Sequence, residues 1–179
     1  MRILLFSLFP PFSPPQAIKP KNNTAANKIH GTIREFGVTS DSNIETSDGT
    51  ALFWLLSRVI DKQGNVISYQ YEEVINNGEF YLNRIEYASG RSIRFSYETR
   101  KDKQTGYYAG AVLNSNKILK NISTYIGQMQ FKQYQFNYNT YENGLYTQLT
   151  EIIESGQNGQ RYNWESVLFW EFLRNWIPQ

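Results

Sequence analysis

A recurring interval between a leucine and a later glycine constrains the fold of this chain more than any single motif. Three leucines each precede a glycine by eight residues, in the pairs Leu56 and Gly64, Leu82 and Gly90, and Leu119 and Gly127. Each interval starts in residues that favour strands, reaches a turn cluster at the glycine and continues into a second strand-like run. The unit is therefore a β-hairpin, and its recurrence predicts an internal repeat.

The clearest copy runs from residue 54 to residue 71. Its turn is the cluster from Asp61 to Asn65. In the second strand, Val66, Ser68 and Gln70 alternate with Ile67, Tyr69 and Tyr71. A period of two places these two sets on opposite faces of a sheet. Asp61 and Asn65 also suggest calcium, but the run of acidic and amide ligands of a calcium-binding loop is missing, so we interpret them as turn-forming residues.

The other copies keep this pattern with varying fidelity. In the first two copies an isoleucine and an aromatic residue follow the glycine, and in the third copy the register slips. Leu149 starts a weaker fourth copy, with glycines at 156 and 159. Because a lone hairpin is marginal in water, we predict that successive hairpins pair edge to edge. The expected fold is all-β, an antiparallel meander of hairpin repeats; a plain sheet or sandwich with coincidental spacing is the alternative.

The residues expected to matter are architectural. Those predicted to form turns are Gly64, Asn65, Gly90 and Gly127, and those predicted to supply cross-strand aromatic contacts are Tyr69, Tyr71, Phe95, Tyr97, Phe136 and Tyr138. We expect Gly64→Val to reduce soluble expression.

The two ends of the chain differ in character. Residues 1–30 are predicted to be an irregular, disordered leader and linker, with a polar stretch at 19–28. Its first apolar run resembles the start of a signal peptide, lacks a clear cleavage site and is too short to span a membrane. Residues 31–179 are predicted to be the hairpin-repeat segment, interrupted by a polar connection at 99–117.

Little in the sequence points to catalysis, and we expect no enzymatic activity, cofactor or metal. The chain has no cysteine, and its one histidine, His30, has no companion at metal-ligand spacing. Glu72 and Glu73 are adjacent, so on a strand they point to opposite faces. Basic and aromatic residues interleave from Lys132 to Tyr138, but a net charge of +2 argues against nucleic acid, so we interpret them as sheet residues.

Several strings in order resemble a known family. They are WLLSRVIDKQGNVISYQYEE, FYLNRIEYASGRSIRFSYETRKD and YQFNY, and the likeness runs from about Glu35 to Trp170. They resemble the SpvB-type N-terminal region, which is shared by Salmonella-type virulence plasmid proteins and the B component of insecticidal toxin complexes and is related to Rhs/YD-repeat proteins. The first thirty residues do not match that family, and the chain resembles a fragment of it.

The resemblance implies a secreted toxin scaffold in which β-hairpin repeats form a shell around a toxic C-terminal cargo. The expected partners are the remainder of the same shell or a toxin-complex partner subunit. The ADP-ribosyltransferase signature of some members, Glu-x-Glu, does not occur in these residues. An alternative from another class is a surface adhesion or carbohydrate-binding β domain that uses exposed tyrosine and tryptophan as a stacking platform.

Overall fold

The computed structural model describes residues 25–29, 31–45, 51–74, 78–108, 111–141 and 146–165, and almost all of them lie in strands. The elements, in chain order, are β1 (Ala25–Ile29), β2 (Thr32–Phe36), the 3-10 turn η1 (Ser40–Ser42), β3 (Asn43–Glu45), β4 (Ala51–Trp54), β5 (Leu56–Ile60), β6 (Val66–Val74), β7 (Glu79–Tyr87), β8 (Arg91–Tyr108), β9 (Ala111–Ile126), β10 (Met129–Tyr141), β11 (Tyr146–Gly156) and β12 (Arg161–Glu165).

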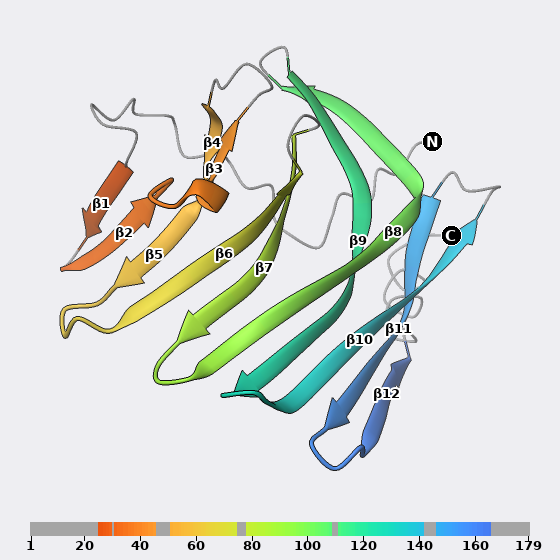
Figure 1. The fold of residues 1–179 in the computed structure, drawn as a ribbon. Helices are drawn as coiled ribbons and strands as arrows, with labels where there is room; N and C mark the ends of the chain where they lie inside the picture. The colour runs from red at the N-terminus through yellow and green to blue at the C-terminus, as the bar shows by residue number, and fades with distance from the viewer. Residues whose placement is uncertain are drawn as a thin grey trace, which may run out of the picture.

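Ten of these strands form one antiparallel sheet, in the order β1-β2-β5-β6-β7-β8-β9-β10-β11-β12, while β3 and β4 form a small separate ribbon (Figure 1). Each strand therefore pairs with its neighbour in sequence, apart from the excursion through β3 and β4. The predicted all-β meander of hairpins is confirmed. In the part of the chain that the structure describes, no helix is long and apolar enough to cross a membrane.

Two sequence-based interpretations of connecting segments need correction. Residues 25–28 fall in the predicted polar linker, yet they belong to β1, which pairs along its length with β2. Residues 99–117 were expected to be a connection, yet 99–108 and 111–117 belong to the far ends of β8 and β9, paired from Gln104 with Ser115 to Tyr108 with Ala111. Both segments were predicted to be loops because their side chains are polar, but strand pairing depends on backbone hydrogen bonds. The leader before residue 25 lies outside the described residues.

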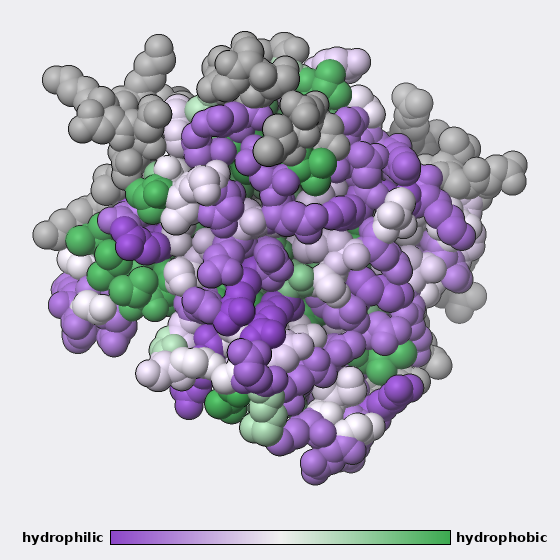
Figure 2. Space-filling view, in the orientation of Figure 1, coloured by the Kyte–Doolittle hydropathy of each residue, from purple (hydrophilic) through white to green (hydrophobic). Residues whose placement is uncertain are grey.

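The two faces of the sheet differ in chemistry. A row across five strands on one face reads Tyr69, Ile85, Ile93, Thr124 and Lys132, and the neighbouring row on the other face reads Gln70, Arg84, Arg94, Ser123 and Gln133. The first face is largely apolar and the second is polar, as period-2 alternation requires. Figure 2 shows a largely hydrophilic surface in the orientation of Figure 1.

Fully buried side chains are few among the described residues: Ser42, Ile44 and Ser57 lie near the N-terminal side of the sheet, and Ser92 lies in β8. Ile44 is the only buried hydrophobic side chain among the described residues, and it is fully inaccessible. Next to it, the hydroxyls of Ser42 and Ser57 lie 2.7 Å apart, and the Val38 N–H donates to Ser57 Oγ. The η1 turn thus packs onto β5, whereas side chains elsewhere in the sheet are mostly half-buried.

Candidate functional site

The predicted glycine turns lie at one end of the sheet, each between two strands that pair directly. Gly64, Gly90 and Gly127 have φ values of 83°, 71° and 62°, in the left-handed region that glycine tolerates best. The first turn is held by Asp61, whose carboxylate accepts hydrogen bonds from the Gln63 and Asn65 N–H groups and from the Asn65 side chain. These bonds lower the pKa of Asp61, the Asn65 side chain contributing most. Asn65 therefore serves the turn through its own side chain.

The leucines of the repeat mark β-bulges. Where β7 pairs with β6, Leu82 faces Tyr71 and Arg84 faces Gln70, so Asn83 has no opposite residue. The same arrangement follows each of the four leucines, and the extra residues are Ser57, Asn83, Lys120 and Thr150. A bulge inserts one residue on one strand, so positions three apart return to the same face. The weak fourth copy, at Leu149, thus shares the geometry of the others.

This geometry pairs the predicted aromatic residues with aliphatic ones. Tyr69 faces Ile85, Phe95 faces Ile122, and Phe136 faces Ile152, in each case three residues beyond a bulge leucine. Among the described residues, Tyr97 alone of the six predicted aromatics contacts another ring, Tyr81, with the centroids 4.9 Å apart and the planes tilted by 50°. Aromatic and branched aliphatic side chains pack well across strands.

Each hairpin opens into a seam on the side away from its turn. The β5–β6 ladder stops at Arg58 and Ser68, the β7–β8 ladder at Arg84 and Arg94, and the β9–β10 ladder at Asn121 and Gln135. In the first strand of each hairpin, a bulge leucine lies two residues before the last paired residue: Leu56, Leu82 or Leu119. In the second strand, a tyrosine lies three residues after the last paired residue: Tyr71, Tyr97 or Tyr138. We call these three gaps the first, second and third seams.

A tyrosine hydroxyl closes every seam. Tyr71 donates to the Leu56 carbonyl at 2.9 Å, Tyr97 to the Leu82 carbonyl at 2.8 Å, and Tyr138 to the Leu119 carbonyl at 2.7 Å. We refer to these bonds as the tyrosine clasps. Where the ladder stops, the leucine carbonyl has no backbone N–H from the second strand to accept, and the tyrosine hydroxyl donates to it instead.

The clasp tyrosines are held in their neutral form. Burial is the main cause that raises the pKa of Tyr97 and of Tyr138 to about 12, with a smaller contribution from nearby Tyr81 and Glu98 respectively. Burial likewise raises the pKa of Tyr71 well above its usual range. A phenol that donates to a carbonyl must keep its proton, so the clasps persist at neutral pH.

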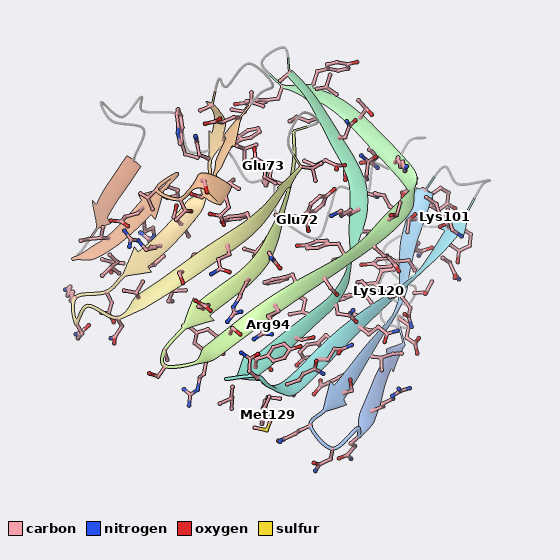
Figure 3. The ribbon with its side chains drawn as sticks, in the orientation of Figure 1. Glu72, Glu73, Arg94, Lys101, Lys120 and Met129 are labelled. Carbon is pink, nitrogen blue, oxygen red and sulfur yellow. The ribbon has the colours of Figure 1, made fainter. Side chains whose placement is uncertain are left out.

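Beyond the seams, the ribbon of β8 and β9 twists until its two strands contact different neighbours. Opposite Asn116, β8 carries an enlarged bulge between Thr99 and Gln104. Past it, β9 approaches β7, where the Glu79 carboxylate accepts the Asn116 N–H at 2.6 Å. On the other side, Asp102 of β8 accepts the Thr147 N–H of β11 at 2.8 Å. In Figure 1 β8 crosses β9, and Figure 3 shows Lys101 at the bend of β8 near β11.

Both of these carboxylates are buried. Asp102 is 7% exposed and also pairs with Arg100, whose Nε and Nη2 donate to it at 3.0 and 3.1 Å. Burial alone would raise the pKa of Asp102, but the hydrogen bonds from Arg100 and Thr147 outweigh it and hold the pKa below its usual value. A third carboxylate, Asp41, accepts the Tyr71 N–H at 2.8 Å beside the first seam. Sequence reasoning missed all three, because their partners are backbone groups far along the chain.

The recurring features of this region are structural ones. Within the described ranges, no group of three or more histidine, cysteine, aspartate or glutamate residues could hold a metal ion. The features that recur from hairpin to hairpin are the turn, the bulge and the clasp, and all three shape the sheet.

Solved structures share this fold. Over 70% of this chain and 58% of the other, the chain is similar to the N-terminal domain of effector protein SpvB from Salmonella typhimurium strain LT2, with a TM-score of 0.63 and 13% identity. It also resembles a chain of the Photorhabdus luminescens Tc holotoxin pore, at 15% identity and a TM-score of 0.64, and a chain of the TcdB2-TccC3-Cdc42 crystal structure, at 13% and 0.62. Each of these two matches covers 74% of this chain and 9% of the other.

The comparisons at the level of sequence find no match, either to a family model or to a curated protein. At 13–15% identity, the structural likeness establishes a shared fold, that of the SpvB N-terminal domain and the toxin-complex chains. The chain spans little more than half of the SpvB domain and a small part of the toxin-complex chains.

Proposed function

We propose that this chain is a wall segment of a toxin scaffold of the SpvB and toxin-complex type and has no enzymatic activity of its own. In this role, successive hairpins extend a β shell around a toxic C-terminal cargo. Its partners are the remainder of that shell or a toxin-complex partner subunit, and the assembly is secreted. The fold shared with the SpvB domain and the Tc toxin chains supports this proposal.

One observation carries the proposal: ten strands lie in a single layer with one apolar face and two terminal strands, β1 and β12. A sheet normally buries its apolar face against a second layer. Here most described side chains of that face are half-buried, and several apolar ones at the turn end are exposed, namely Ile67, Ile126 and Met129. Such a layer suits a wall, where the cargo or adjoining wall covers the face and further strands extend the edges.

Co-expression with the reading frames next to its gene tests this role. We expect a complex that survives size-exclusion chromatography, with chemical cross-links from residues near β12 or the apolar face to the neighbouring product. A chain that stays monomeric in every co-expression, without cross-links, would contradict a wall segment.

A glycan-binding module is the second candidate, and one observation favours it. Tyr107 is 77% exposed on the far end of β8, where its ring is open to stack on a sugar. Glycan-array binding by the purified chain that is lost in Tyr107→Ala would support this candidate over the wall.

A further inference from the structure

The last ladder pair before each seam offers a comparison within one molecule. These pairs occupy the same position in their hairpins and lie on the polar face: Arg58 with Ser68, Arg84 with Arg94, and Asn121 with Gln135. Because the backbone geometry repeats, differences between the three positions come from their side chains.

At the first and third seams the side chains satisfy one another. Arg58 pairs with Glu35, with its Nε 2.7 Å from the carboxylate. Asn121 donates to Ser96 and accepts from Gln133, and Gln135 donates to Asn137. The charge of Arg58 is thus balanced by Glu35, and Asn121 and Gln135 are uncharged and form hydrogen bonds.

The second seam has an excess of positive charge. Arg84 and Arg94 face each other directly, and like charges at opposed positions destabilise a sheet. Glu86 pairs with Arg84 at 2.5 Å, while Arg94 makes no ion pair among the described residues. The two guanidinium groups thus have one paired carboxylate, and it belongs to Arg84.

Both guanidinium groups also have unused donors. Arg84 Nε is inaccessible to solvent and has no hydrogen-bond partner among the described residues. Arg94 makes only long bonds, at 3.4 Å to Ser92 Oγ and 3.5 Å to the Gly127 carbonyl, and its guanidinium lies 3.9 Å above the Tyr125 ring. The ring orients Arg94 without using its N–H groups. Figure 3 shows Arg94 between the lower parts of β7 and β8.

We propose that Arg84 and Arg94 form a binding site for an oxyanion, a carboxylate or a phosphate, at the mouth of the second seam. A planar guanidinium fork matches two oxygens of such an anion, and two forks on adjacent strands provide donors from two sides. The bound anion offsets the repulsion between the two arginines and accepts from the solvent-facing N–H groups of their guanidiniums. The site does not depend on the proposed wall role.

Thermal unfolding of the full chain tests the site, with sodium phosphate and sodium acetate titrated separately at constant ionic strength. We expect one or both anions to raise the Tm by about 2 °C at saturation, since a ligand of the folded state stabilises it by mass action. A rise with phosphate alone identifies the phosphate form, and a rise with acetate identifies the carboxylate form. No rise with either anion would overturn the site.

Matched variants localise the effect. Arg84→Gln and Arg94→Gln should each abolish the rise, whereas Arg58→Gln, at the corresponding position of the first seam, should keep it. Arg84→Lys and Arg94→Lys keep the charge but lose the fork, so a weakened response is expected even if the glutamine variants fold poorly. A full response in both glutamine variants would assign the anion to another part of the surface and overturn the proposal.

Discussion

At the two ends of the hairpins in this sheet, the backbone N–H and C=O groups find their hydrogen-bond partners in different ways. At the turn end, adjacent strands pair by backbone ladders, with one bulge at Phe131 in β10, and glycines such as Gly64 and Gly127 reverse the chain. At the seam end, three of the ladders stop, and side chains take their place: a tyrosine clasp across each seam and buried carboxylates where the twisted β8–β9 ribbon meets β7 and β11.

The difference shows how one repeat can be regular at one end and adaptable at the other. Backbone ladders at the turn end need only a turn and alternating side chains, so any well-formed hairpin suffices. At the seam end each unpaired carbonyl or N–H group needs a particular side chain at a particular distance. Stability at the seam end should therefore depend on single residues and on their protonation state.

Alkaline pH should distinguish the two ends most strongly. The pKa of Tyr97 and Tyr138 is raised to about 12 in the folded protein, against about 10 for a free tyrosine. The folded state holds these protons more tightly, so their contribution is complete below about pH 10 and is lost as the pH rises toward about 12. Urea unfolding at pH values across this window should show a steep fall in the free energy of unfolding.

A variant with phenylalanine at Tyr71, Tyr97 and Tyr138 is the control for this experiment. It should be less stable at neutral pH and should show a shallower fall on the alkaline side. Equal slopes in the two proteins would mean that other tyrosines or lysines cause the alkaline loss.

Removing the carboxylate of Asp102 should be the most damaging single change. Asp102→Ala leaves the Arg100 guanidinium and the Thr147 N–H without their buried acceptor, at a cost of about 3 kcal/mol in the free energy of unfolding. Lys103→Ala, on an exposed neighbour of the same bulge, should change it by less than about 0.5 kcal/mol. Chemical denaturation measures both, and comparable losses would show that the bulge matters as backbone and not through its carboxylate.

At the turn end, Gly64→Val should cost about 1–2 kcal/mol, because a branched residue is strained at a φ of 83°. A Cβ atom there would meet no other atom within 4 Å, so the expected cost is conformational. Gly64→Asn should be nearly neutral, since asparagine tolerates the left-handed region. A melting temperature that Val leaves unchanged would show that the turn relaxes to another conformation.

The sequence predicted the turn end better than the seam end, for a physical reason. Turns and alternation are local, so the positions of Gly64 and Gly90 and the hairpins themselves were readable from neighbouring residues. The seams depend on bonds between residues fifteen to forty-five positions apart, such as Tyr71 with Leu56 and Asp102 with Thr147. Local polarity even misled, because the charged stretch around Asp102 resembled a loop.

One signal of the seams was nevertheless present in the sequence. Leu82 and Ile85 are three residues apart, a spacing that puts two side chains on opposite faces of a regular strand. The same spacing recurs at Leu119 with Ile122 and at Leu149 with Ile152. Read as a repeat, it would have predicted a bulge after each leucine, and the tyrosine of the following strand would have been the natural candidate to fill the gap.

The smallest expected effect isolates a single clasp by comparing two tyrosines of one strand. Tyr71→Phe removes only the hydroxyl that donates to the Leu56 carbonyl, and we expect a loss of about 1 kcal/mol in the free energy of unfolding. Tyr69, two residues earlier on the same face, packs against Ile85, and its hydroxyl makes no hydrogen bond among the described residues. Tyr69→Phe should therefore change stability by only a few tenths of a kcal/mol. Hydrogen exchange should place the difference in the strands beside the first seam, β5 and β6, and leave the ladder between β10 and β11 unaffected. If the two variants lose equal stability, the tyrosines act through their rings alone, and the seams are held by packing and not by the clasps.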